Sequence, residues 1–351
     1  MKTEISKFTS SKGVITTYKL TNNIGASVTL SSVGAGIVSV IVPDSQGNMT
    51  DVVLGYADVC DYLYDGPCAG KIAGRFANRI AKGELTIDGT KYALSVNCGP
   101  NHLHGGPEGF QNQIWESQEI HNGVKFTRMS RDGEENYPGN LYVEVEYTWN
   151  DDCELAIKMT AETDKKTVVN LTNHAYFNLD GENCGSILDD ELWLNCSKYL
   201  PTDESLVPDG TFASVDGTPM DFRCPMIIGT PINSDFLPIV YGKGYDNCWA
   251  IDNWEKGKLQ HVARLVSHKS GRVLDVSSTQ PAVQVYTGNW LSDSPTNKQG
   301  NKYSDYDGIA IECQAMPDAP NKPTFPSTFL APGEKYEEII TYKFSNNNTL
   351  H

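Results

Sequence analysis

The sequence lacks any long hydrophobic run. No stretch of its 351 residues approaches the 18 or so consecutive apolar residues that a membrane-spanning helix needs. The first ten residues, Met1 to Ser10, also lack the apolar segment of a secretory signal peptide. We therefore expect a cytoplasmic protein that does not enter a membrane.

Positive charge is scarce. The chain has 28 Lys and Arg residues against 44 Asp and Glu residues, which gives a formal net charge of -16 at pH 7. Such a charge repels phosphate backbones and anionic lipid surfaces at long range. The composition therefore argues against nucleic acid and membranes as binding partners.

Paired cysteine motifs are absent as well. The nine cysteines include no C-x-x-C pair, and an odd number cannot all form disulfides within one chain. Reduced thiols in a cytosolic protein are the simplest interpretation. The cysteines are Cys60, Cys68, Cys98, Cys153, Cys184, Cys196, Cys224, Cys248 and Cys313.

Helical signals and domain boundaries are also few. No long segment has the 3.6-residue periodicity of an amphipathic helix, and only Asp58 to Leu63 looks like a short capped turn. The chain has no low-complexity linker, no sharp change of composition and no clean internal repeat. We expect one domain over residues 1–351.

Short runs rich in Val, Ile, Thr and Tyr recur throughout, separated by Gly, Asn, Asp and Pro, which predicts many strands joined by tight turns. Sheets without covering helices must pack on one another, so this pattern favours a large all-β sandwich or barrel. The expected strands are Gly34 to Val42, a hairpin from Glu84 to Leu94 turning at Asp88-Gly89, Leu141 to Trp149, Leu155 to Ala161, Thr167 to Asn173, and a hairpin from Arg272 to Gln284.

Two of these apolar, β-prone segments each carry one titratable group. His174 lies in Asn170-Leu-Thr-Asn-His-Ala-Tyr-Phe-Asn-Leu179, and Glu312 lies in Ile309-Ala-Ile-Glu-Cys313. A histidine and a glutamate held on two strands could form an acid–base pair. Each could equally be a buried polar residue satisfied by its neighbours.

Four further segments hold polar residues in unusual settings. They place Asn78 and Arg79 among small residues, His104 before the Gly105-Gly106 turn, Asp246 after Gly244-Tyr245, and Gln284 in a Val-rich run. Two neighbours in these segments have less specific interpretations: Arg75 is expected to be a surface or ion-pairing residue, and His102 to be structural or exposed. A metal site at His102 and His104 lacks an evident third ligand, so we expect none.

At this point the chain resembles the galactose mutarotase (aldose 1-epimerase) family. The resemblance runs from about Thr16 to Phe344 and rests on G-R-F-A-N-R-I, L-H-G-G, N-L-T-N-H-A-Y-F-N-L, G-Y-D-N, Q-V-Y-T-G-N and E-C-Q-A-M-P-D-A, all in the family's order. Any one motif would be weak, but six in order are specific.

The resemblance implies a large, mostly antiparallel β-sandwich with an open sugar-binding cleft on one sheet. It implies Glu312 as general base and His174 as general acid in the interconversion of α and β anomers of free hexoses such as galactose and glucose. The residues implied to line the sugar site are Asn78, Arg79, His104, Asp246 and Gln284. We expect no metal, no cofactor, and a monomer or homodimer.

This chemistry suits the two groups. Opening a hemiacetal ring removes a proton from the C1 hydroxyl and delivers one to the ring oxygen, and ring closure reverses both steps. We expect Asp246 and Glu312 to favour the charged form of His174 by Coulomb attraction. A hexose-6-phosphate epimerase and a non-catalytic carbohydrate-binding protein of the same fold remain as alternatives.

Overall fold

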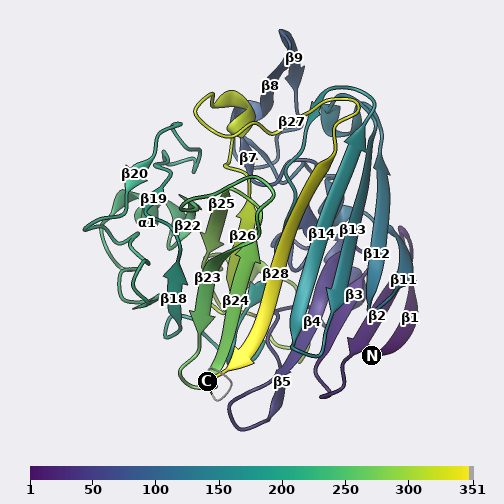
Figure 1. Cartoon of the computed structure of the whole chain (residues 1–351), viewed down its shortest axis with the longest axis vertical. Coiled ribbons are helices and arrows are strands. Elements are labelled where there is room, and N and C mark those ends of the chain that lie inside the picture. The colour runs from purple at the N-terminus through teal and green to yellow at the C-terminus, as the bar shows by residue number, and fades with distance from the viewer. Residues whose placement is uncertain (348–351) are drawn as a thin grey trace.

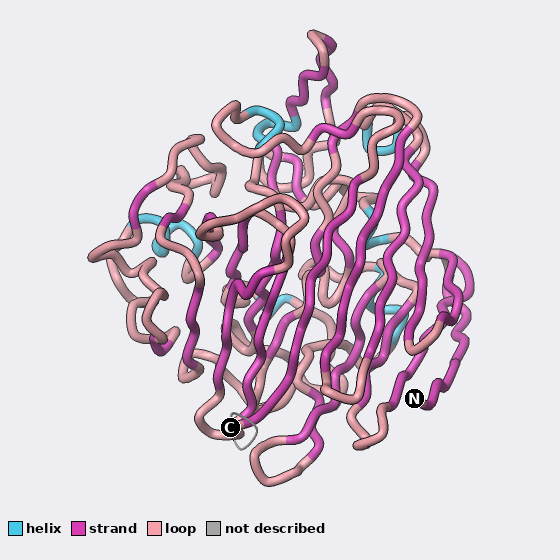
Figure 2. Tube along the Cα trace, viewed as in Figure 1, coloured by secondary structure: helices cyan, strands magenta, loops and turns pink. Residues whose placement is uncertain are grey.

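The computed structural model describes residues 1–347, and strands dominate it (Figure 2). Within these residues the α-helical structure is one short helix, α1 (Leu237–Gly242). Single 3-10 turns occur at Val59–Leu63, Ala81–Gly83, Phe110–Asn112, Glu134–Asn136, Leu291–Asp293 and Ala319–Asn321. None of the helices in this part of the chain has the length and apolar composition needed to cross a membrane.

The largest sheet has nine antiparallel strands and forms one layer of the molecule. One of its faces is buried: along β13 (Leu141–Trp149) the odd-numbered residues are buried, whereas the intervening ones are at least partly accessible. Its strand order is β11 (Glu116–Ile120), β12 (Gly123–Ser130), β13, β14 (Glu154–Thr163), β28 (Tyr336–Asn346), β24 (Arg272–Ser278), β23 (Gln260–Val266), β18 (Glu191–Leu194), β21 (Met226–Ile227).

Two smaller sheets lie on the buried side of the nine-stranded sheet (Figure 1). The five-stranded sheet contains β1 (Lys2–Ser10), β2 (Gly13–Thr21), β3 (Ser27–Ser31), β4 (Gly36–Pro43) and β5 (Met49–Asp51). The six-stranded sheet has the order β17 (Tyr176–Phe177), β26 (Ile309–Gln314), β25 (Ala282–Tyr286), β22 (Asp246–Ala250), β19 (Lys198–Tyr199), β20 (Ala213–Ser214).

Four two-stranded ladders complete the strand inventory of the described residues. They pair β10 (His102–Leu103) with β7 (Arg79–Ile80), β15 (Thr167–Val168) with β27 (Phe329–Leu330), β16 (Thr172–Asn173) with β6 (Ile72–Ala73), and β8 (Glu84–Ile87) with β9 (Thr90–Ala93). The β7–β10 and β6–β16 ladders matter most for function, because they connect the segments that carry the candidate site residues.

Aromatic contacts join the layers. Tyr18 of β2 meets Phe126 of β12 edge to face, and Phe177 of β17 meets Tyr342 of β28 in the same way. One core cluster of buried side chains contains residues from all three large sheets. The expected all-β, mostly antiparallel sandwich is therefore confirmed.

Most expected strands are present, but one hairpin prediction is wrong. The hairpin at Asp88-Gly89 forms with both residues at positive φ, and the run from Thr167 to Asn173 divides into β15 and β16. The segment from Arg272 to Gln284, however, is not a hairpin. Its two strands, β24 and β25, belong to different sheets, because the chain crosses between layers at Thr279 to Pro281.

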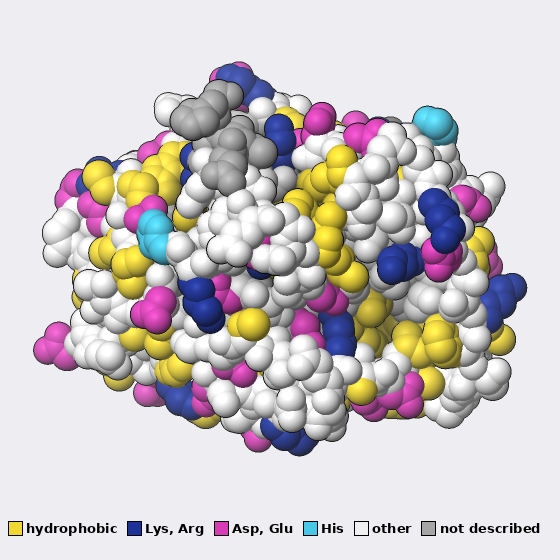
Figure 3. All heavy atoms as spheres, turned by 90° about the horizontal axis from the view of Figure 1, so that it is seen from below, with side chains coloured by type: hydrophobic (Ala, Val, Ile, Leu, Met, Phe, Trp, Pro, Cys, Tyr) yellow, Lys and Arg dark blue, Asp and Glu magenta, His cyan; other side chains and the backbone are white. Residues whose placement is uncertain are grey.

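The end of the molecule that is lowest in Figure 1 bears a mixed surface. Figure 3 shows this face with acidic and basic side chains scattered among hydrophobic and uncharged ones. The N-terminus lies near the same end (Figure 1). The candidate site instead lies on the six-stranded sheet.

Candidate active site

The site is built on the face of the six-stranded sheet that points away from the main core. Along β26, Ile311 and Cys313 enter the core, so the alternation of a strand turns Glu312 to the opposite face. Gln284 of β25 is the direct cross-strand partner of Glu312. Pairing register, and not nearness in sequence, brings these residues together.

Asp246 lies diagonally across from Gln284 on the same face and links it to Arg79. Gln284 Nε2 donates a hydrogen bond to Asp246 Oδ1 at 2.6 Å. The other carboxylate oxygen, Oδ2, accepts from Arg79 Nη2 at 3.3 Å. Arg79 begins β7, so the carboxylate ties the sheet to the β7–β10 ladder.

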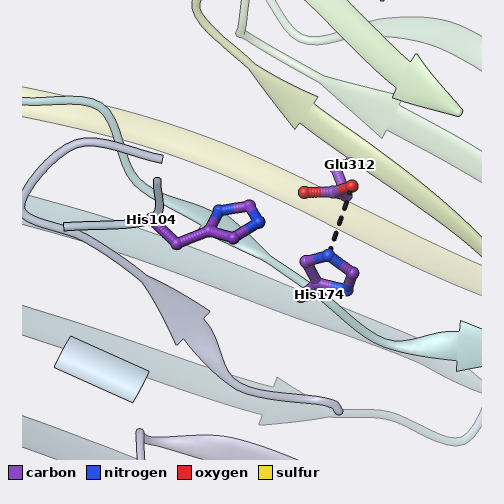
Figure 4. A group of neighbouring side chains, drawn as sticks. All are labelled: His104, His174 and Glu312. Carbon is purple, nitrogen blue, oxygen red and sulfur yellow. Dashed lines mark ion pairs between the residues drawn. The ribbon is translucent and has the colours of Figure 1, made fainter. Parts of the chain in front are cut away.

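His174 lies between β16 and β17 and is held at both sides of its peptide. Its backbone N–H donates to Lys71 O at 2.9 Å, and its carbonyl accepts from Gly70 N at 2.9 Å. Its side chain faces Glu312, with 3.5 Å between His174 Nε2 and Glu312 Oε1 (Figure 4). The histidine and the glutamate that were expected to form an acid–base pair are therefore in direct contact.

His104 approaches this pair from a loop with positive φ (Figure 4). Its Nδ1 accepts a hydrogen bond from the backbone N–H of Asn78 at 3.1 Å, so a neutral His104 must carry its proton on Nε2. Gly105 follows at φ +84, and a Cβ there would lie 1.8 Å from Gly74 O. Only glycine fits this turn, which explains the L-H-G-G sequence locally.

A cavity of about 370 Å³ opens over these groups. Six of the seven residues predicted from the sequence line it: Asn78, Arg79, His104, His174, Asp246 and Glu312. Gln284 does not contribute to the cavity wall and instead contacts Asp246. Several polar atoms here are buried without a hydrogen-bond partner, including His174 Nδ1, Glu312 Oε2 and Gln284 Oε1. Unsatisfied groups of this kind are expected where a polar ligand binds.

Burial dominates the electrostatics of the pair. It lowers the pKa of His174 to about 4, although Asp246 pulls that pKa upward. Burial, with a smaller contribution from Asp246, raises the pKa of Glu312 well above its ordinary value. Nearby carboxylates were expected to favour charged His174, but the cost of desolvation outweighs their attraction.

The site contains side chains of the types that bind metals, but the protonation of His104 opposes metal binding. One ligand atom each from His104, His174 and Glu312 lies within 4.8 Å of the others. The Nδ1 of His104 is occupied by the Asn78 N–H, so its Nε2 carries a proton and presents no lone pair. This geometry favours hydrogen-bond donation over metal coordination.

Two neighbouring residues have structural roles. Arg75 is neither a surface nor an ion-paired residue: it is buried and donates to the carbonyls of Pro138 and Gly139 at 2.9 and 3.0 Å. His102 is buried and structural, with its ring nitrogens 2.6 Å from Ser95 O and Tyr137 Oη.

Other residues also line the cavity, and their position there is harder to predict from the sequence. Tyr176 and Tyr286 line the cavity, as does Trp290, which is 58% exposed. Trp290 directly follows the Q-V-Y-T-G-N motif, and this position was the sign in the sequence that it lies near the site. Leu206 and Asp293 also line it, and nothing in their local sequence marks them.

The chain is similar to known proteins over nearly its whole length. The family model described as aldose 1-epimerase matches residues 16–343. The galactose mutarotase of Rattus norvegicus is 41% identical over 344 residues, 98% of each chain. The aldose 1-epimerase of Escherichia coli K12 is 38% identical over 93% of this chain and 94% of its own. The solved structure of an aldose epimerase homologue from C. elegans has a TM-score of 0.86 at 30% identity, covering 98% of this chain and 99% of that chain.

Proposed function

Because the chain belongs to the aldose 1-epimerase family, we propose that it interconverts the α and β anomers of free hexoses such as galactose and glucose. Family membership carries the reaction type, an isomerisation at C1 of a sugar. The roles of individual residues and the preference for free hexoses are the proposal. The observation that supports it most is the buried His174–Glu312 pair at the floor of the cavity.

Glu312 is the proposed general base and His174 the proposed general acid. With one proton shared between them, the pair can exist as carboxylate and imidazolium or as carboxylic acid and neutral imidazole. Burial favours the neutral distribution, whereas sugar hydroxyls that donate to the carboxylate favour the charged one. The proton that His174 needs to act as an acid can therefore come from Glu312, and no group outside the pair has to supply it.

In the forward step, the Glu312 carboxylate takes the proton of the C1 hydroxyl while the His174 imidazolium gives its proton to the ring oxygen. The C1–O5 bond breaks, the aldehyde turns about C1–C2, and the same two transfers in reverse close the ring on the other face. Each positioned proton-transfer group typically contributes a factor of ~10² to 10⁴, so the two together lower the barrier by on the order of 5 to 10 kcal/mol.

The remaining predicted residues are proposed to hold the sugar. Asn78 uses its Oδ1 to accept from the Arg79 N–H at 2.7 Å, so its Nδ2 is the group available to a hydroxyl. His104 offers its Nε2–H, and Asp246 offers carboxylate acceptors held by Arg79 and Gln284. Gln284 then supports Asp246 through its Nε2, and its Oε1 has no hydrogen-bond partner within the protein.

A hexose 6-phosphate is a poorer fit. Among the described cavity-lining residues the cation is Arg79, and it is already paired with Asp246, whereas Asp293 and Glu312 add acidic groups. A phosphate there would meet repulsion without a free cation to offset it. A purely carbohydrate-binding protein would have no use for a buried acid–base pair, so catalysis is the better interpretation.

Polarimetry tests the proposal. Pure protein should accelerate the change in optical rotation of freshly dissolved α-D-galactose and α-D-glucose above the buffer rate, and should leave glucose 6-phosphate near that rate. No acceleration with either free sugar would exclude the proposed activity. Acceleration with the phosphate alone would move the assignment to a sugar-phosphate epimerase, and calorimetric binding without acceleration would indicate a binding protein.

Three broader predictions remain proposals. We propose that residues 1–351 act as one domain, supported by a core cluster that runs from Tyr18 to Phe344; residues 348–351 lie outside the described part of the chain. A cytoplasmic location is supported by nine cysteines that are all free thiols. The net charge of -16 supports the absence of nucleic acid partners, and a monomer or homodimer is likewise a proposal.

A further inference from the structure

A fully buried ion pair lies next to the backbone that holds His174. The side chains of Lys71 and Asp65 are completely inaccessible and contact each other, and Lys71 Nζ also donates to Tyr62 O at 2.6 Å. Burying two charges costs several kcal/mol per ion, and well-packed apolar side chains can often replace such a pair without loss of stability. The pair therefore calls for an explanation other than stability alone.

Lys71 is connected to the proposed acid through its own main chain. Its carbonyl accepts the His174 N–H, and the preceding Gly70 N–H donates to the His174 carbonyl, both at 2.9 Å. Asn173 Nδ2 adds a third link by donating to Gly70 O at 2.7 Å. Whatever fixes residues 70 and 71 therefore fixes the peptide of His174 on both sides.

The other end of the ion pair is fixed equally firmly. Asp65 Oδ2 accepts from Tyr56 Oη at 2.9 Å and from the Ala69 N–H at 2.8 Å. The segment between Asp65 and Lys71 is thereby closed on itself, and two of its residues, Gly66 and Pro67, line the cavity. One ion pair thus holds both a wall of the cavity and the backbone of His174.

We propose that the buried Lys71–Asp65 ion pair is a positioning device for His174, holding its imidazole at the working distance from Glu312. This inference rests on the proposed role of His174 as proton donor. Lys71 and Asp65 contact neither the cavity nor the reacting atoms, so they act through His174 and the loop.

The charge of Lys71 also acts on His174. It is one of the influences that lower the pKa of His174, after burial. The other charged or titratable groups near the imidazole are Asp246, Glu312, His104, Tyr176 and Tyr286. Removing Lys71 alone should therefore raise the pKa of His174, whereas removing Asp65 together with Lys71 opposes that rise, because a negative charge is lost as well.

The test replaces the pair together, by Lys71→Met with Asp65→Asn, so that no buried charge is left unpaired. The matched control is Lys298→Met with Asp51→Asn, which removes another ion pair of 2.7 Å that does not contact His174. Two readouts are measured: the NMR titration of the His174 ring without ligand, and kcat and KM for galactose. The first does not depend on turnover.

We expect the Lys71–Asp65 variant to shift the His174 titration midpoint, because a displaced imidazole meets Glu312 and Asp246 at other distances, and to lower kcat about tenfold or more, with KM within about twofold, as expected for a misplaced acid. The control should match the parent in both the titration midpoint and the kinetic constants.

If the double variant does not fold, Tyr56→Phe, which removes only one hydrogen bond to Asp65, should still lower kcat at unchanged KM. Parent-like titration and kcat in the folded variant overturn the proposal. A parent protein without mutarotation would refute the proposed function, while the titration would still test the positioning.

Discussion

His174 Nε2 lies 3.5 Å from Glu312 Oε1, and both side chains are buried at the floor of the cavity. Burial lowers the pKa of the first and raises that of the second, so both groups resist charge. Two neutral partners retain one proton between them, which is the number that the proposed reaction consumes and returns. This proton must pass from Glu312 to His174 before ring opening, and sugar hydroxyls that donate to the carboxylate favour that transfer.

Removing either partner should abolish most activity. Glu312→Gln removes the proposed base, and His174→Asn removes the proposed acid, while both keep a polar side chain of similar shape. We expect kcat/KM for galactose to fall by a factor of ~10² to 10⁴ in each variant. Polarimetry over a range of galactose concentrations measures the effect.

The control for this pair is Glu337→Gln, which neutralises a carboxylate of the same kind on a side chain that is 44% exposed. It should keep the parent's rate. Circular dichroism should show all three variants folded. Near-normal turnover in a folded Glu312 or His174 variant would contradict the role assigned to that residue.

The same pair predicts how stability depends on pH. His174 has a folded pKa of about 4 against 6.5 unfolded, so alone it would make stability fall as pH falls from about 6.5 to about 4. Glu312 has a folded pKa above 4.5, so alone it would make stability fall as pH rises above 4.5. Above pH 4.5, while the folded pair keeps a protonated Glu312 and a neutral His174, the folded and unfolded pairs each bind one proton, and the two effects oppose each other.

Glu312→Gln should remove this opposition. The variant keeps the buried histidine but loses the carboxylate, so its free energy of unfolding should decline as pH falls from about 6.5 to about 4 more steeply than that of the parent. Urea unfolding at several pH values measures both proteins. Parallel curves for parent and variant across this window would show that the two groups do not share a proton.

The sequence was sufficient to predict the types of element and to propose a set of site residues, six of which line one cavity, but not to predict how these residues meet. Alternation along Ile309 to Cys313 predicts that Glu312 faces away from Ile311, since a strand has a period of two. That Gln284 lies opposite Glu312 depends on register between β25 and β26, which no local pattern encodes. The family resemblance implied only that both residues belong to one site.

The errors have the same physical origin. The turn residues from Ser278 to Pro281 favour a hairpin locally, yet burial of β24 and β25 in different layers decides the path of the chain. Arg75 carries a charge that usually stays at the surface, but carbonyls from a distant loop satisfy its guanidinium inside the protein. Tertiary partners outweighed local tendency in both places.

Gln284 should act through Asp246. Gln284→Met removes the 2.6 Å hydrogen bond to Asp246, and Asp246→Asn removes the charge that accepts it. Hydrogen bonds to charged groups are worth about 1.5 to 3 kcal/mol, so each change should raise KM for galactose by roughly tenfold or more. Because the two residues share one interaction, the double variant should lose much less than the sum of the single effects in free energy. Additive losses would mean that Gln284 recognises the sugar independently of Asp246.

Gly105 should be irreplaceable for steric reasons. An alanine Cβ at this position would lie 1.8 Å from Gly74 O, so Gly105→Ala must displace the turn that carries His104. The matched control is Gly89→Ala in the β8–β9 hairpin, where φ is +82 rather than +84 and no atom lies within 4 Å of the added Cβ.

At both positions the alanine must adopt a left-handed backbone conformation, which costs about 1 to 2 kcal/mol in each case. Gly105→Ala alone also meets the clash, so it should unfold at a clearly lower urea concentration than Gly89→Ala and lose galactose turnover, while Gly89→Ala keeps the parent's kcat and KM. Urea unfolding and polarimetry on the three proteins measure the difference. Equal stability and equal turnover in the two variants would show that the backbone at Gly74 and Gly105 can separate without disturbing His104, and would remove the steric explanation of the glycine.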